Sequence, residues 1–211
     1  MRRQKEDTDH VRFLKPDEEK KLRDAIRSKP EWAEHEVEFD LALHTGIRRS
    51  SMYIGLVGEN VDLEAKTLTI PRASMKDDER ITLPLNPDAM RALSVFRSRG
   101  NGTGRVVRNA AGETLLVNAH WFPDAVRAAG IPRFRWHDCR HTFASRLRQK
   151  GVDLATIAEL LGHSPKSGFA LTKRYAHLAI SNLHDAVSLI SNSTTVAPAP
   201  NIEVSEFAMV Q

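Results

Sequence analysis

The sequence predicts an α+β fold that is mostly α, with a small antiparallel sheet in its N-terminal half. Prolines and acidic residues stand where helices would begin, and glycines where they would end. The pattern changes to a two-residue alternation over residues 67–70 and 80–85, on either side of a polar turn. The chain has 211 residues, 41% of them hydrophobic, which is enough for one ordinary domain with a sizeable core.

Three helices are expected in the first part of the chain. Residues 16–28 begin with a proline and three acidic residues and carry lysines and arginines later, which suits the helix dipole. Residues 31–45 are rich in apolar side chains and are followed by Gly46, a typical residue just past a helix end. A short third helix is expected over residues 50–56.

The strands and the later helices follow. The two alternating segments flank a polar hairpin at residues 71–79, and residues 105–107 and 114–117 are expected to pair across a turn. Gly151 and Gly162 mark breaks between later helices. Further helices are expected at residues 88–97, 120–129, 141–150, 153–161, about 169–176 and 183–191.

The end of the chain differs in composition from the rest. Residues 192–211 are rich in Ser, Thr, Pro and Ala and contain two glutamates but no Lys or Arg. We therefore expect a domain at residues 1–191 and a C-terminal tail at residues 192–211. The apolar residues 204–210 are expected either to dock, on this chain or on a neighbouring copy, or to fray.

The overall composition excludes several classes of protein. The chain has 31 Lys and Arg against 27 Asp and Glu, and its net charge of +4 permits a polyanionic partner without requiring one. Its single cysteine, Cys139, excludes a disulfide framework and a zinc site with several cysteines, and indicates a reducing, cytoplasmic setting. Neither a membrane-spanning segment nor a signal peptide is expected.

Two basic motifs lie in the N-terminal half. Arg48 and Arg49 directly follow the expected end of a helix, where a guanidinium can bind a phosphate through two hydrogen bonds. Taken alone, such a pair is more often a solvated surface feature. Lys76 lies in the polar hairpin, where a flexible lysine can act as a proton donor or point charge, although lysines are common in such turns.

A basic segment with interleaved aromatic residues and histidines follows. If the segment 136–144 is the first part of a helix, His137 and Arg140 share one face and can contact one anionic group. Arg133 and Arg135 add positive charge just upstream. A charged run is usually a solvated helix face, but this composition favours nucleic-acid binding.

A last segment places a histidine and a tyrosine near further cations. His163 follows Leu161 and Gly162, and Tyr175 directly follows Lys173 and Arg174. A phenol with a pKa of about 10 is a poor nucleophile until cations stabilise its oxyanion or a base takes its proton. A single tyrosine in a helix is usually a half-buried core residue, so this motif gains weight only in combination with the others.

In this order, the motifs resemble those of the tyrosine recombinase (phage integrase) family. The matching segments are TGIR at 45–48, Lys76 before Pro84, HDCRH at 137–141, LGH at 161–163 and RYAH at 174–177. The resemblance covers about residues 12–190, which corresponds to the family's catalytic domain. It implies the DNA breaking-rejoining fold, and site-specific recombination or integration as the activity.

The resemblance also implies the catalytic residues: Arg48, Lys76, His137, Arg140, His163 and Tyr175. It implies that Tyr175 attacks a DNA phosphodiester to form a 3′-phosphotyrosine, which is followed by strand exchange and religation. Phosphoryl transfer depends mainly on positioning and charge stabilisation. The phosphotyrosine conserves the bond energy, so neither a metal, ATP nor another cofactor is expected.

The remaining roles also follow from the resemblance. Arg48, Arg140 and His163 would hold the nonbridging phosphate oxygens, and Lys76 would protonate the departing 5′-oxygen. His137 would accept a proton or bind the phosphate. The expected partner is double-stranded DNA. The chain is expected to form a homotetramer on DNA and to be a monomer in isolation. Its expected location is the cytoplasm, in association with the nucleoid.

Residues near the motifs are interpreted separately. Asp138 is expected to orient a histidine or cap a helix, and Cys139 to lie in the core. For His141 two roles stay open, packing of the helix or a direct part in catalysis, and packing is favoured. Further DNA contacts are expected from Arg49, Arg133, Arg135, Lys173 and Arg174.

Three departures from the family pattern keep alternatives open. Ser51 stands where the family usually has a carboxylate, and the 12-residue step from His163 to Tyr175 is longer than usual. Only a short segment precedes the first expected helix, where the family usually has an N-terminal DNA-binding domain, so we expect either an expressed catalytic fragment or a truncated protein. Weak, salt-sensitive DNA binding is expected of this chain alone. A catalytically silent DNA-binding module and a type IB topoisomerase are the alternative functions.

Overall fold

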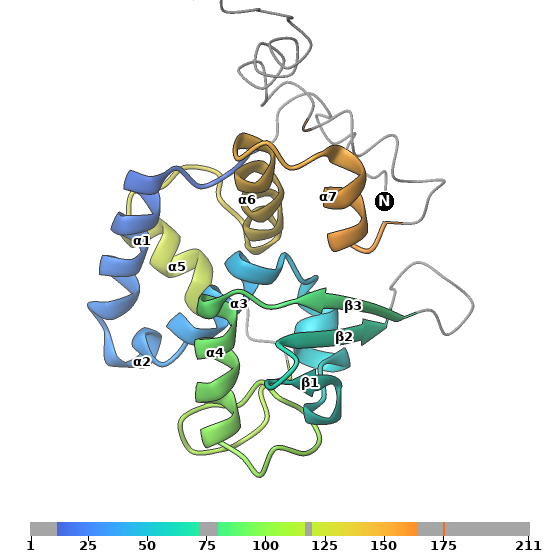
Figure 1. The fold of residues 1–211 in the computed structure, drawn as a ribbon. Helices are drawn as coiled ribbons and strands as arrows, with labels where there is room; N and C mark the ends of the chain where they lie inside the picture. The colour runs from blue at the N-terminus through green and yellow to red at the C-terminus, as the bar shows by residue number, and fades with distance from the viewer. Residues whose placement is uncertain (1–11, 72–79, 117–119, 164–174, 176–211) are drawn as a thin grey trace, which may run out of the picture. The chain divides into compact units, whose positions relative to one another are not determined.

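The computed structural model describes residues 12–71, 80–116, 120–163 and Tyr175. All of them belong to the first of two units of the chain, residues 1–179. The described elements are mostly helices, together with a three-stranded antiparallel sheet (Figure 1). This confirms the predicted mostly helical fold with a small antiparallel sheet.

The elements follow one another in the order helices, sheet, helices. The first helices are α1 (Pro16–Arg27), α2 (Pro30–Ala33), α3 (Glu36–Thr45), the π-helix η1 (Ser51–Gly55) and the 3-10 helix η2 (Gly58–Asn60). The strands are β1 (Val61–Asp62), β2 (Thr67–Pro71) and β3 (Arg80–Pro84). The later helices are α4 (Pro87–Ser98), α5 (Trp121–Ala128), α6 (Trp136–Gln149) and α7 (Leu154–Leu160).

Helix α1 begins where the sequence predicts. Pro16 occupies its first turn, and the carboxylate of Glu18 accepts a hydrogen bond of 3.0 Å from the main-chain N–H of Lys15. Leu22 and Ile26, four residues apart, are both fully buried. The helix therefore presents one apolar face to the core and leaves its charged residues outside.

The single helix expected over residues 31–45 is instead two helices, α2 and α3. The break brings His35 into the core, where its Nδ1 lies 2.5 Å from Oε1 of Glu38 and its ring stacks on Trp121 at 4.9 Å. Glu38 is fully buried and also accepts a hydrogen bond from the hydroxyl of Tyr53. A buried carboxylate needs such partners, so this tertiary network overrides the local helical pattern.

The predicted hairpin strands are confirmed as β2 and β3. Their register pairs Leu68 with Leu83 and Ile70 with Ile81, and all four side chains are buried. The apolar face of the sheet therefore faces the core, as the two-residue alternation indicates. The turn between the strands lies outside the described residues. Strand β1, which pairs with β2, was not expected from the sequence.

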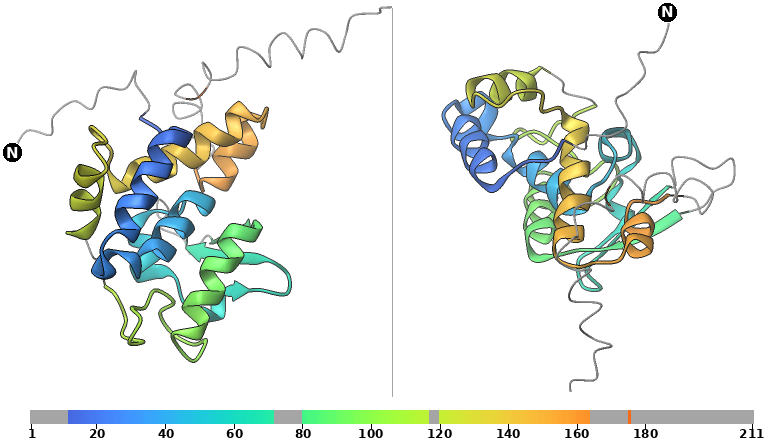
Figure 2. Two further views of the ribbon diagram at one scale, coloured as in Figure 1. Left: turned by 90° about the vertical axis from the view of Figure 1, so that its left-hand side faces the viewer. Right: turned by 90° about the horizontal axis from the view of Figure 1, so that it is seen from above.

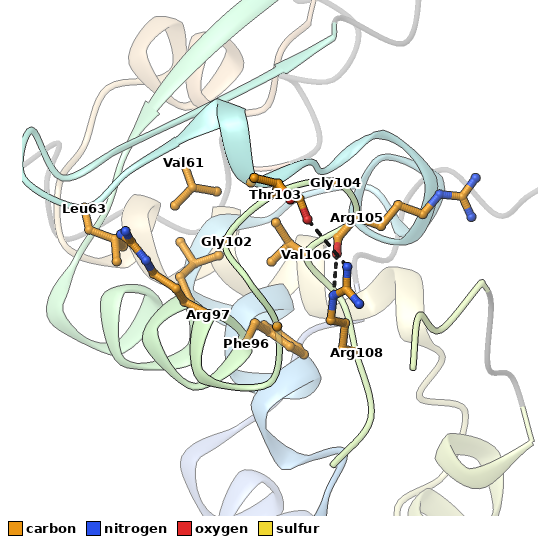
Figure 3. A pocket seen from close by; sticks show the side chains of 13 residues that line it. Val61, Leu63, Phe96, Arg97, Gly102, Thr103, Gly104, Arg105, Val106 and Arg108 are labelled. Carbon is orange, nitrogen blue, oxygen red and sulfur yellow. Dashed lines mark hydrogen bonds between the residues drawn. The ribbon is translucent and has the colours of Figure 1, made fainter. Parts of the chain in front are cut away.

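Instead of the strand pair expected at 105–107 and 114–117, the described residues have one isolated bridge between these segments, from Arg108 to Thr114, and a second from Arg105 to Val57. Part of this segment pairs elsewhere, because the N–H of Val106 donates to the carbonyl of Leu56 at 3.1 Å. The guanidinium of Arg108 donates to main-chain carbonyls of the loop, including that of Arg105 at 3.1 Å (Figure 3). These side-chain hydrogen bonds satisfy the loop without a regular ladder.

Helix α6 begins five residues earlier than predicted. The carboxylate of Asp138 accepts a hydrogen bond of 2.6 Å from the N–H of Arg135, which is the N-terminal cap residue. Asp138 therefore caps the helix, one of its two expected roles. The helices at 88–97, 120–129 and 153–161 correspond to α4, α5 and α7, whereas 183–191, and 169–176 apart from Tyr175, lie outside the described residues.

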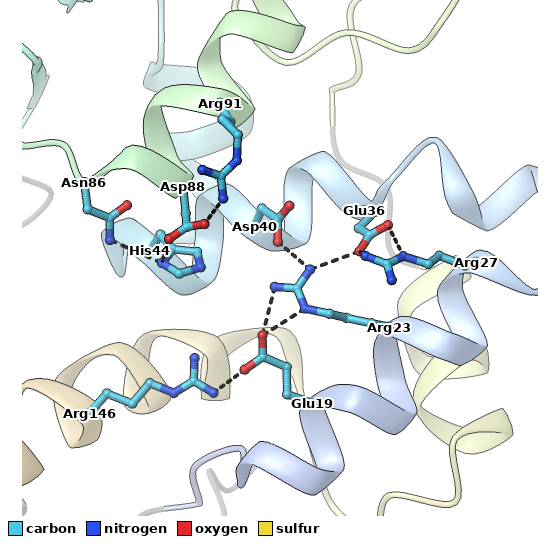
Figure 4. A network of polar contacts seen from close by, with 10 residues as sticks. All are labelled: Glu19, Arg23, Arg27, Glu36, Asp40, His44, Asn86, Asp88, Arg91 and Arg146. Atoms are coloured by element: carbon cyan, nitrogen blue, oxygen red, sulfur yellow. Dashed lines mark hydrogen bonds and ion pairs between the residues drawn. The ribbon is translucent and has the colours of Figure 1, made fainter.

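A network of ion pairs joins α1, α3 and α6 (Figure 4). Arg23 of α1 contacts Glu19 at 2.8 Å and Asp40 of α3 at 2.6 Å. Glu19 in turn accepts a hydrogen bond from Arg146 of α6. Close to this network, the N–H of Leu14 donates to the buried hydroxyl of Thr142 at 2.9 Å. Helix α6 is thus held against α1 by both charged and neutral hydrogen bonds.

The core consists of two clusters. The larger draws buried side chains from α1, α3, η1, the sheet, α4, α5 and α6, including Cys139 as expected. The smaller consists of Ala144, Ile157, Leu161 and Tyr175. It lies between α6 and α7, which run side by side (Figure 2). Tyr175, although distant in sequence, is therefore packed against the two helices that carry the other motifs.

Candidate active site

The first part of the candidate site is the sharp end of α3. Gly46 has a φ of +62°, a left-handed conformation that glycine adopts without strain. A Cβ at this position would lie 2.6 Å from Cδ1 of Phe143 on α6, which is too close for van der Waals contact. Glycine is thus required both for the turn and for the approach of α6. The turn leads directly into Arg48.

Arg140 of α6 joins three segments of the chain. Its Nη1 donates to the carbonyl of Gly46 at 2.7 Å, and its Nη2 donates to the carbonyl of Leu161. The same Nη2 lies 3.2 Å from Nε2 of His163. The side chain is only 6% exposed, and the neutral acceptors fix its plane without neutralising its charge.

The electrostatics of Arg140 reflect this burial. Desolvation and the nearby Arg48 cation lower the pKa of Arg140 to about 9, and Tyr175 acts in the opposite direction. Arg140 therefore still carries its charge at neutral pH. Two arginines held close together in a half-dry environment repel each other, so an anion placed between them would be strongly favoured.

Arg48 faces the same place. It is half-buried, and desolvation lowers its pKa. Arg48, Arg140 and Ser51 line one small pocket, together with apolar residues of the hairpin and the end of α7. Ser51 adds no negative charge to this pocket, so the two guanidinium groups determine its electrostatic character.

His163 completes the cluster. Gly162, with a φ of +62°, turns the chain out of α7, and His163 is buried against Arg140. Burial first, and then the cations Arg140 and Arg48, lower the pKa of His163 to about 4. The ring is therefore neutral at pH 7, and its Nε2 accepts the hydrogen bond from Arg140.

His137 lies on the same side of α6 as Arg140, one turn away. Desolvation, followed by the charge of Arg140, lowers the pKa of His137. Its ring meets that of His141 edge to face, with centroids 5.0 Å apart. One helix therefore presents His137, Arg140 and His141 within two turns, a denser arrangement than the predicted pair.

Tyr175 is almost fully buried, with 2% of its surface exposed. Its hydroxyl lies 2.6 Å from Nδ1 of His141. The sequence favoured packing over direct catalysis for His141 and did not predict this contact with Tyr175. The available signal was its position four residues after His137 and next to Arg140, which places it beside the motif face of the helix.

The other predicted residues have separate positions. Lys76, Lys173 and Arg174 lie outside the described residues. Arg133 is exposed, and the side chain of Arg135 is 72% exposed near the start of α6. The half-buried Arg49 instead faces the internal network, where its charge opposes the rise in the pKa of Tyr53 that burial and Glu38 cause.

A larger pocket, of about 100 Å³, lies elsewhere, between β1, α4 and the loop that follows α4 (Figure 3). Apolar side chains such as Val61, Phe96 and Val106 line it together with several arginines. No residue of the motif cluster contributes to it. The pocket is therefore separate from the candidate active site.

Within the ranges that the structure describes, no three His, Cys, Asp or Glu side chains come together as possible ligands of a metal ion. None of the helices in the same ranges is both long and apolar enough to cross a bilayer.

Comparison with known proteins identifies the family to which the chain belongs. The model of the phage integrase family matches residues 12–181. The integrase of Salmonella phage P22 is 33% identical over 211 aligned residues, which cover 93% of this chain and 51% of that protein. The XerD tyrosine recombinase of Lacticaseibacillus casei is 29% identical and covers 76% of this chain and 57% of its own length. The chain thus spans about half the length of these curated relatives.

Solved structures share the fold. The Tn1549 transposon integrase in complex with circular intermediate DNA superposes with a TM-score of 0.70 at 19% identity, over 88% of this chain and 69% of that one. The catalytic domain of bacteriophage HP1 integrase has a TM-score of 0.59 at 23% identity, over 89% of this chain and all of that domain. The described part therefore has the fold of a tyrosine recombinase catalytic domain, and the chain belongs to the phage integrase family.

Proposed function

We propose that this chain is the catalytic domain of a site-specific recombinase that cuts and rejoins double-stranded DNA through Tyr175. The supporting observation is the convergence of Arg48, Arg140 and His163, three groups far apart in the sequence, around one pocket edge with Tyr175 close by. This arrangement provides two cations and a histidine for a phosphodiester and a phenol to attack it. Membership of the integrase family is consistent with the same chemistry.

The roles of the groups follow from their chemistry. Arg48 and Arg140 hold the nonbridging oxygens, where negative charge grows in the transition state, and His163 supports Arg140 and the phosphate. Attack by Tyr175 forms the bond from its oxygen to phosphorus and breaks the bond to the 5′-oxygen. Lys76 protonates that oxygen as it leaves, and His137 acts as a further phosphate ligand or proton acceptor.

The partners extend this proposal. Arg133, Arg135, Lys173 and Arg174 add contacts to the DNA backbone, whereas Arg49, expected from the sequence to do the same, faces the internal network. Strand exchange takes place in a homotetramer on two DNA sites. The reaction uses neither a metal nor ATP, because the phosphotyrosine conserves the energy of the broken bond. It takes place where the DNA lies, in the cytoplasm.

The test is capture of the covalent intermediate. The protein is incubated, with EDTA and without nucleotide, with a library of duplexes of varied sequence that each carry a nick, so that the released fragment diffuses away. Protein-linked DNA is then recovered under denaturing conditions and sequenced. Wild-type protein should yield adducts at one sequence, and Tyr175→Phe should yield none.

The chain provides a matched control. Tyr53 is its only other tyrosine, and it is buried beside Glu38 away from the pocket, so Tyr53→Phe should retain adduct formation. Adducts that persist in Tyr175→Phe, or their absence from a folded wild-type protein on DNA that it binds, would contradict the proposal. Relaxation of supercoils without strand exchange would instead favour a topoisomerase.

A further inference from the structure

The contact between His141 and Tyr175 gives the nucleophile a partner that none of the roles above uses. Nδ1 of His141 and the hydroxyl oxygen of Tyr175 are 2.6 Å apart, within the range of a strong hydrogen bond. The rings are tilted at 44° with centroids 6.1 Å apart, so the contact is made through this nitrogen rather than by stacking. The inference rests on the proposed function, because it requires Tyr175 to be the attacking group.

The tyrosine hydroxyl needs a proton acceptor. A phenol with a pKa of about 10 is mostly protonated at neutral pH, so the proton must leave as the bond to phosphorus forms. In a neutral imidazole one nitrogen accepts and the other carries hydrogen, so a ring that accepts at Nδ1 carries its proton on Nε2. His141 in that form receives the hydrogen bond from Tyr175.

The other histidines of the cluster are engaged differently. His163 directs its Nε2 to Arg140, and His137 contacts the His141 ring edge to face. Among the described residues, the charged and titratable groups near the contact include Arg140 and His137 on the same helix, and Arg48 and His163 on the segments packed against it. Tyr175 raises the pKa of Arg140, so this cation and the tyrosine oxygen attract each other when that oxygen carries negative charge.

We infer that His141 is the proton acceptor for Tyr175, and therefore a catalytic residue that contacts the reacting oxygen. In cleavage, the bond from Tyr175 oxygen to phosphorus forms, the bond to the 5′-oxygen breaks, and the tyrosine proton moves to Nδ1 of His141. The 5′-oxygen receives its proton from a different group. In rejoining, an incoming 5′-hydroxyl gives its proton to the group that protonated the 5′-oxygen in cleavage and forms the bond to phosphorus. The bond from phosphorus to the tyrosine oxygen breaks, and His141 returns the proton to that oxygen.

The test compares His141→Gln with His120→Gln, an exposed histidine at the start of α5. Adduct formation is measured on the nicked duplex, with binding followed separately on the same DNA. We expect His141→Gln to slow adduct formation by roughly 100-fold or more with unchanged DNA binding, the size typical of a lost general base. His120→Gln should react at the wild-type rate.

The pH profile and a chemical rescue separate proton transfer from positioning. The wild-type rate should fall as the pH is lowered and His141 is protonated, and should level off at higher pH. The His141→Gln rate should show no such plateau and should keep rising with hydroxide concentration. A fluorotyrosine at position 175 has a more acidic phenol. It should raise the rate of adduct formation of His141→Gln at least tenfold and should change the rate of the protein with wild-type His141 little. If His141→Gln does not fold, as judged by its melting curve, His141→Asn replaces it.

The possible outcomes distinguish this inference from the proposed function. A His141 variant with the wild-type rate and pH profile, or a slow variant that fluorotyrosine does not rescue, overturns the inference while the loss of adduct in Tyr175→Phe still supports the proposed function. Adducts in Tyr175→Phe overturn the proposed function itself.

Discussion

Replacing Gly46 with alanine should destabilise the domain by about 2–5 kcal/mol. The left-handed conformation, with its φ of +62°, costs an alanine roughly 1–2 kcal/mol. The new Cβ would lie 2.6 Å from Cδ1 of Phe143 and 3.2 Å from Cδ2 of Leu161, and relieving such overpacking typically costs about 1–3 kcal/mol more. The magnitude therefore combines a backbone contribution and a packing contribution.

Urea unfolding at pH 7.5 measures the change, with Gly130→Ala as the control. Gly130 has a similar φ of +66°, but a Cβ there would meet nothing within 4 Å, so this variant isolates the backbone contribution. Gly46→Ala should therefore lose clearly more stability than Gly130→Ala, and the difference should shrink in a Phe143→Ala background, where the ring is gone. Equal losses in the two glycine variants would refute the close packing of α3 on α6.

Two further predictions concern the charges around α6. Glu19→Gln weakens the partly buried contact to Arg146 and should lower the free energy of unfolding by about 1–2 kcal/mol. Asp24→Asn, in an exposed pair, should change it by less than about 0.5 kcal/mol, and similar losses for the two variants in urea titrations would contradict this. The pKa of His163 is about 4 in the folded protein and about 6.5 in the unfolded chain, which therefore binds the proton more readily. The free energy of unfolding should therefore be highest above pH 6.5, where His163 is neutral in both states, and should fall by up to about 3 kcal/mol as the pH is lowered to 4. Urea unfolding measures this change, and His163→Gln should remove this part of the pH dependence.

Local signals predict most of the elements. The proline and acidic start of α1 and the alternation in β2 and β3 depend on neighbouring residues, so they can be read directly from the sequence. The break between α2 and α3 cannot, because it depends on Glu38, a buried carboxylate whose partners include the distant Tyr53. The conformation of the loop around Val106 likewise depends on a main-chain hydrogen bond to a residue distant in sequence, Leu56.

The candidate site shows the same division. The order of the motifs singles out Arg48, Arg140 and His163, and the structure brings these side chains together, while their catalytic roles stay predictions. The partners of Arg140 could not be predicted, because two of its acceptors are main-chain carbonyls that no side-chain pattern reveals. The contact of His141 with Tyr175 joins residues 34 positions apart, and packing rather than motif spacing determines it.

Helix α6 connects the stability of the domain with its chemistry. The helix presents His137, Arg140 and His141 to the site, and its opposite flank is held by Arg146 and Thr142 against α1 and the segment before it. Arg140 is buried because these contacts and the turn at the end of α3 close around it. Within the described part of the chain, Arg140 is hydrogen-bonded to neutral acceptors, which is costly for a buried charge and would be compensated by an anion. In the function that we propose, that anion is the phosphate, whose negative charge grows during the reaction.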